Sequence, residues 1–141
     1  MWLKLATFGL LPVVLIQGTK VRSNTPRLPE ASGDREGKTG QGKPLSLLIL
    51  GDSAAAGVGV ENQQDALSGA IISELKTEYK LHWKLHAKTG DTTKQVYQAI
   101  QQLEPKKYDV VVTSVGVNDV TKLISAKTWI KQQKQLFTQI Q

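Results

Sequence analysis

The sequence predicts an α/β fold built on a doubly wound parallel sheet. Strand-like segments occur at residues 45–50, an apolar run, at 81–87, where apolar and polar residues alternate, and at 108–114, around an apolar Val-Val-Val core. Segments with the helical spacing of apolar residues alternate with these strand-like segments, and each strand-like segment ends at small or polar residues. Strands that alternate with helices favour parallel pairing, with helices covering the faces of the sheet.

The first residues do not resemble the interior of a domain. Residues 1–17 contain one lysine followed by an uncharged apolar run at 5–16. As a helix this run of 12 residues would span about 18 Å, against a hydrocarbon core of about 30 Å, which favours the h-region of a signal peptide. No clear Ala-x-Ala site follows, so a membrane anchor with Trp2 and Lys20 at the interfaces and a first helix of the soluble domain remain alternatives. We expect an exported or membrane-anchored chain, extracytoplasmic if it is bacterial.

Residues 18–44 form a second region of different composition. They are rich in Gly, Pro, Ser, Thr and charge and have almost no apolar periodicity, which is typical of a flexible linker. The predicted domain is then 45–141. It carries eleven Lys or Arg against nine acids, so most of the formal charge of +6 lies before it, and we expect no nucleic-acid partner. The absence of cysteine excludes disulfides and a thiol nucleophile.

The first predicted strand presents a serine at its end. Residues 45–50 stop at Gly51, and Asp52 and Ser53 follow with only small side chains at 54–57. Glycine allows a sharp exit from a strand, and small neighbours leave space around the hydroxyl. A P-loop would need Lys and Ser or Thr after its second glycine, and a dinucleotide fingerprint would need a third glycine, so both fail on spacing. A plain strand-to-helix turn remains the alternative.

The remaining elements follow in alternation. We expect helices from about 62 to 79, capped by Asn62 or Asp65, from Asp91 to 103, and from Ser125 onward. The strand at 81–87 alternates apolar residues with His82, Lys84 and His86. We interpret both histidines as structural or surface residues. No carboxylate pattern near them supports a metal site, and we expect neither metal nor cofactor.

Two further strand ends carry small and polar residues. Gly90 closes the turn after the strand at 81–87, and the sequence Gly116-Val117-Asn118-Asp119 follows the strand at 108–114. Because parallel strands end at the same edge of a sheet, we expect these residues to converge on Ser53. Taken singly, Gly90 is compatible with a turn glycine, Asn118 with a helix cap, and Asp52 and Asp119 with structural roles.

In the order and spacing of these motifs, the chain resembles the SGNH hydrolases, also called GDSL esterases and lipases. The resemblance covers roughly residues 45–129. It implies a three-layer α/β/α flavodoxin-like fold, a small-molecule or lipid ester substrate, and Ser53 as nucleophile. It also implies an oxyanion hole from the Ser53 and Gly90 N–H groups and the Asn118 side chain. Gly51, Asp52, Gly116 and Asp119 take supporting positions in these motifs.

The chain departs from the family pattern in two places. Ala54 stands where the motif has leucine, and the chain has no Asp-x-x-His block to supply a catalytic histidine. We therefore expect a domain that is incomplete at its C-terminal end, with feeble ester hydrolysis or none, because an alcohol is a poor nucleophile without a base. The alternative is a non-catalytic ligand-binding or interaction module on this fold. A flavin or nucleotide binder is a weaker third option.

Overall fold

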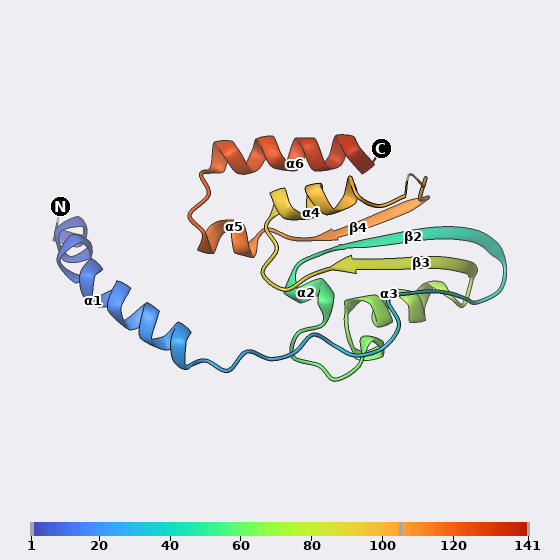
Figure 1. Ribbon diagram of the computed structural model, residues 1–141, viewed down its shortest axis with the longest axis horizontal. Helices are drawn as coiled ribbons and strands as arrows, with labels where there is room; N and C mark the ends of the chain where they lie inside the picture. The colour runs from blue at the N-terminus through green and yellow to red at the C-terminus, as the bar shows by residue number, and fades with distance from the viewer. Residues whose placement is uncertain (1, 105, 141) are drawn as a thin grey trace.

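The computed structural model describes residues 2–104 and 106–140, with the side chains of these residues except 2–9 and 22. A four-stranded sheet lies at its centre in the order β1-β3-β2-β4 (Figure 1). The strands are β1 (Glu36–Thr39), β2 (Lys43–Gly51), β3 (Tyr79–Ala87) and β4 (Val110–Ser114). Strand β2 pairs in parallel with β3 and with β4, which confirms the three predicted strands and their parallel arrangement.

Helices cover both faces of this sheet (Figure 1). Helix α3 (Leu67–Leu75) packs on one face, and helices α4 (Thr93–Ile100) and α6 (Ala126–Ile140) pack on the other. The predicted doubly wound α/β class is therefore confirmed. The sheet is open: among the described residues β4 has a partner strand only on its β2 side.

The core follows from the continuous apolar run in β2. Leu47 and Ile49 belong to the cluster under α3, whereas Leu48 and Leu50 belong to the cluster under α4 and α6. A strand covered on both faces must be apolar at every position, and this explains why the run does not alternate. Full burial of each of these side chains contributes about 1.5–3 kcal/mol, so β2 is the central element of the fold.

Strand β1 was not predicted, because it lies in the segment expected to be a flexible linker. Glu36–Thr39 pairs antiparallel with β3, with Gly37 opposite Trp83. A Cβ on Gly37 would come within 3.2–3.3 Å of the Trp83 ring, so the glycine leaves room for the indole. The linker expectation is wrong for this stretch. Its backbone pairs with that of β3, and such pairing holds a strand in place even though the sequence has no apolar periodicity.

Several helix boundaries also differ from the expectation. The helix predicted from about 62 to 79 is a 3₁₀ turn, η1 (Gln63–Asp65), followed by α3. Helix α4 begins at Thr93 and not at Asp91, because the Gln95 side chain accepts hydrogen bonds from the N–H and hydroxyl of Thr92 at 3.1 and 2.9 Å. Helix α6 begins at Ala126, one residue after the predicted start, and Ser125 caps it, since its Oγ accepts the Thr128 N–H at 3.2 Å.

Helix α1 (Trp2–Asn24) extends away from the sheet layers (Figure 1). It continues beyond the predicted boundary at residue 17 into the expected linker. In the described part of the chain, every helix is too short or too polar to cross a membrane. The predicted division into 1–17, 18–44 and 45–141 stays a prediction.

Candidate active site

Ser53 begins the short helix α2 (Ser53–Ala56), directly after β2. A Cβ on Gly51 would collide with the Ser114 carbonyl and the Ala55 methyl group, so only glycine fits where the chain leaves the sheet. Asp52 is buried, and its Oδ1 accepts the Ala54 N–H at 3.1 Å, which caps α2. Ser53 itself is half-buried.

The loop after β3 carries Gly90 in a left-handed conformation. Its φ is +86°, and no atom lies within 4 Å of the position a Cβ would take. The Gly90 carbonyl accepts a hydrogen bond from Lys122 Nζ at 3.1 Å. Its N–H has no hydrogen-bond acceptor among the described residues. The Ser53 N–H likewise has no acceptor in the described part of the chain, because the first N–H groups of a helix lack intrahelical acceptors.

The loop after β4 brings Asn118 to the same edge. Gly116, with φ of +142°, precedes helix α5 (Val117–Thr121), and Asn118 lies in its first turn. Asn118 Nδ2 donates to the Asp91 carbonyl at 3.0 Å and to Asp52 Oδ2 at 3.5 Å. One amide group thus joins the loops after β2, β3 and β4. The residues predicted to converge at the strand ends lie on these three connected loops.

Asp119 occupies a buried position beneath these loops. It is 2% exposed, and its Oδ2 accepts the Thr93 N–H at 2.9 Å and the Thr93 hydroxyl at 3.0 Å. Gln133 of α6 donates to the same hydroxyl at 3.1 Å. Asp119 therefore ties α5 to the start of α4, which is the structural role that the sequence favoured.

Neither histidine forms a hydrogen bond with the Ser53 hydroxyl in the part of the chain that the structure describes. His82 lies five residues before the end of β3, about 17 Å along the strand, and its Nδ1 is 3.2 Å from Lys106 Nζ. Burial, followed by the charges of Lys106 and Lys38, lowers the pKa of His82. Its position on β3 and its lysine neighbour do not suit a base for Ser53.

His86 lies nearer the strand ends and is half-buried. Burial lowers its pKa, and the neighbouring Asp91 carboxylate opposes this effect. The pKa of Asp91 is in turn raised by burial, against the charges of Lys88, His86 and Lys122. At the site, the carboxylate whose charge acts on His86 is therefore that of Asp91. Among the described residues, no three side chains of His, Cys, Asp or Glu lie close enough together to hold a metal ion.

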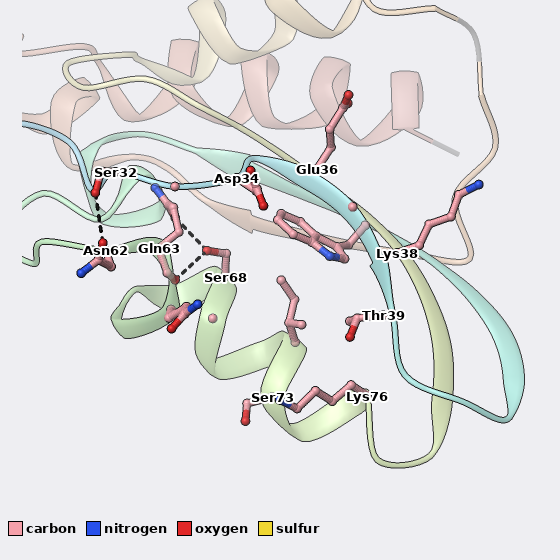
Figure 2. Close-up of a pocket in the computed structure, with 16 residues that line it drawn as sticks. Ser32, Asp34, Glu36, Lys38, Thr39, Asn62, Gln63, Ser68, Ser73 and Lys76 are labelled. Atoms are coloured by element: carbon pink, nitrogen blue, oxygen red, sulfur yellow. Dashed lines mark hydrogen bonds between the residues drawn. The ribbon is translucent and has the colours of Figure 1, made fainter.

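A hollow of about 810 Å³ lies elsewhere, between β1 and α3 (Figure 2). Gln63 and Ser68 lie on its wall and bind each other, with Ser68 Oγ donating to Gln63 Oε1 at 2.8 Å. None of the predicted site residues lines this hollow. The candidate site is therefore defined by the strand-end residues and their free N–H groups.

Sequence reasoning missed two residues that contact these loops. Glu30 and Arg35, both in the predicted linker, bind the loop that leads to Gly90. Their bonds join a side chain to a backbone group far away in the sequence, and no local pattern indicates such contacts.

Comparison with known proteins supplies an independent view of this fold. The model of the GDSL-like Lipase/Acylhydrolase family matches residues 49–141. A search of curated proteins gives no match. Among solved structures, AlinE4, an SGNH-hydrolase family esterase, is 20% identical with a TM-score of 0.59, over 70% of this chain and 53% of that one.

Two other solved structures give the same result. TesA is 21% identical with a TM-score of 0.55, over 67% of this chain and 53% of that one. The psychrotrophic esterase EstA from Pseudoalteromonas sp. is 19% identical with a TM-score of 0.50, over 66% and 51%. At these identities the likeness establishes the fold. The chain spans about half the length of the structures it matches.

Proposed function

Because the chain belongs to the GDSL-like lipase/acylhydrolase family, we propose that its strand-end site is the nucleophile and oxyanion-binding part of an ester hydrolase. One observation carries this proposal. The Asn118 amide bonds to Asp91 and Asp52, so the three loops that bear Asn118, Gly90 and Ser53 meet at one edge of the sheet.

In the proposed reaction Ser53 Oγ attacks the carbonyl carbon of a carboxylic ester. The negative charge then develops on the former carbonyl oxygen. The Ser53 and Gly90 N–H groups, which have no acceptor among the described residues, would donate to this oxygen together with Asn118 Nδ2. Collapse of the tetrahedral intermediate releases the alcohol and leaves an acyl group on Ser53, which water removes in a second step.

The proton of the Ser53 hydroxyl needs an acceptor at the moment of attack. No described histidine bonds to that hydroxyl, and the chain has no Asp-x-x-His motif. We therefore propose that this chain hydrolyses esters feebly or not at all. The same observation favours a second candidate function, a non-catalytic module that binds an ester-containing ligand through the same donors.

Covalent labelling separates the two functions. A fluorophosphonate reacts with an activated serine, whereas ligand binding requires no activation. Labelling at Ser53 that disappears in Ser53→Ala would support the hydrolase. Absence of labelling, together with saturable binding of an ester or a phosphonate analogue seen by calorimetry, would support the binding module.

The apolar run at residues 5–16 supports a separate proposal, that the N-terminus directs export or attaches the chain to a membrane. Expression in a bacterial host, followed by mass measurement of the soluble and membrane fractions, tests it. A shortened soluble chain indicates a cleaved signal, and an intact membrane-bound chain indicates an anchor. An intact chain confined to the cytosolic fraction contradicts both.

A further inference from the structure

Residues 30–35, which we call the brace, touch two of the loops that form the proposed site. The brace precedes β1 and lies within the stretch predicted as a linker. It contacts the loop after β3 through Glu30 and Arg35 and the end of α2 through Ala31.

The contact with the loop after β3 is a charge-assisted bridge. Glu30 Oε1 accepts the Thr89 N–H at 2.6 Å, and Glu30 Oε2 accepts from Arg35 at 2.7 Å. The second nitrogen of the same guanidinium donates to the Ala87 carbonyl at 2.7 Å. Bonds of this kind are about twice as strong as neutral ones. The bridge therefore holds the backbone on both sides of Lys88, immediately before Gly90.

The contact with the serine loop is made by backbone groups and one buried amide. The Ala31 N–H donates to the Ala56 carbonyl at 3.2 Å. Gln63 Nε2 donates to the Ala31 and Ala56 carbonyls at 3.1 and 2.9 Å. The Ser32 hydroxyl adds a bond to Asn62 at 3.1 Å (Figure 2). The brace is thus fixed to the C-terminal end of the helix that begins with Ser53.

Gly90 needs such support more than its neighbours do. Glycine has the freest backbone of all residues, and nothing lies within 4 Å of the missing Cβ of Gly90. An oxyanion donor is effective only if it is held about 2.7–3.1 Å from the position of the developing charge. The Lys122 bond to the Gly90 carbonyl is 3.1 Å long, whereas the bond from the Thr89 N–H to the Glu30 carboxylate is 2.6 Å long, so the Glu30 bond is the firmer restraint.

We propose that Glu30 and Arg35 are positioning residues, which fix the Thr89–Gly90 backbone relative to the helix that carries Ser53. The proposal rests on the proposed function for its catalytic consequence, since Gly90 is the donor that the brace positions. The restraint of the Thr89–Gly90 backbone can be measured without any catalytic turnover.

Glu30→Gln tests the proposal, because it removes the charge with little change in shape. Glu36→Gln is the matched control: Glu36 lies in the same N-terminal region and pairs with Lys84 at 3.0 Å, away from the site loops. In Glu30→Gln we expect amide hydrogen exchange at Thr89, whose N–H donates to Glu30, to accelerate about tenfold, as loss of a charged hydrogen bond allows. The control should match the wild-type chain at this amide.

A second readout separates positioning from a merely structural role. With a fluorophosphonate, Glu30→Gln should lower the maximal inactivation rate about tenfold and leave the concentration at half-saturation unchanged. The thermal midpoint of Glu30→Gln should stay close to that of Glu36→Gln. A fall in inactivation that simply follows a lowered midpoint would overturn the proposal.

Other results of these two experiments would also support or contradict the proposal. Unchanged exchange at Thr89 contradicts the proposed restraint by Glu30 and Arg35, whatever the labelling result. Accelerated exchange with an unchanged inactivation rate overturns the positioning role. If the wild-type chain is not labelled, the proposed function fails, and faster exchange still supports the restraint of the backbone. If Glu30→Gln fails to fold, Arg35→Lys replaces it: lysine lacks the rigid planar guanidinium whose two nitrogens bind Glu30 and the Ala87 carbonyl, so exchange at Thr89 should again accelerate.

Discussion

The side chain of Asn118 lies where the loops after β2, β3 and β4 meet. Its 3.0 Å bond to the Asp91 carbonyl is a full hydrogen bond, whereas the 3.5 Å contact with Asp52 Oδ2 is at the limit of one. One amide hydrogen therefore holds the loops together, and the other is weakly engaged. A weakly engaged donor can turn to a developing oxyanion at little cost, which suits the proposed role.

Replacement of this amide should affect Ser53 chemistry more than folding. We expect Asn118→Ala to lower the rate of Ser53 phosphonylation by about 10²–10³, the usual effect of one lost oxyanion donor. Val120→Ala is the control, because Val120 is 73% exposed on the same short helix. A fall of less than about threefold would count against Asn118 as a donor.

Gly51 has a steric and not a catalytic role. Because a Cβ there would meet the Ser114 carbonyl and the Ala55 methyl group, Gly51→Ala should lower the free energy of unfolding by about 1–3 kcal/mol. Urea unfolding followed by circular dichroism measures this. Gly18→Ala, on α1 where no atom lies within 4 Å of the new methyl group, should leave the unfolding of the sheet unchanged. Equal midpoints for the two variants would contradict the steric account.

At the scale of elements, the continuous apolar run predicted the central strand β2, because burial on both faces leaves a direct signature in sequence. The start of α4 was mispredicted because two adjacent residues, Asp91 and Thr92, both suit a cap. Asp91 instead offers its carbonyl to Asn118, and Thr92 binds Gln95. Choosing between them requires the neighbouring loop, which the local sequence does not contain.

The brace could not be predicted for a related reason. Glu30 is 59 residues from Thr89, and Arg35 is 52 residues from Ala87. Each contact joins a side chain to a backbone group. Every residue has such a backbone group, so the residue types of Thr89 and Ala87 do not indicate the contact in the sequence. Composition alone indicated a linker, and only the fold shows that residues 30–39 of it pack against the domain.

The true linker should therefore be shorter than predicted. Residues 26–29 form neither helix nor strand, and Leu28 is 56% exposed. We expect brief trypsin digestion to cut after Arg27 and to spare the bond after Arg35, whose guanidinium is engaged with Glu30 and Ala87. Mass spectrometry of the stable product should find its first residue at Leu28. Equally fast cleavage after Arg35 would show that the brace is not held.

At the scale of the whole molecule, three ionisable groups near the site respond differently to acid. Burial lowers the pKa of His86, so the unfolded chain takes up this proton first and stability falls as pH drops through about 6.5. Burial opposes ionisation of Glu30, but bonds from Thr89 and Arg35 outweigh it and lower its pKa. Its contribution is present at neutral pH and is lost as pH falls through the folded value. Asp91, with a raised pKa, acts in the opposite direction.

These signs predict two separate falls in stability, which two variants distinguish. Urea unfolding between about pH 7.5 and pH 3.5 should show a first fall near the ordinary histidine pKa and a second below that of glutamate. His86→Gln should reduce the first fall, with the remainder due to His82, whose pKa is also lowered. Glu30→Gln should leave the first fall in stability unchanged and reduce the second fall. Because Glu30 is favoured as a carboxylate only while it binds Thr89 and Arg35, an undiminished second fall in Glu30→Gln would mean that the brace contributes nothing to the folded state in solution.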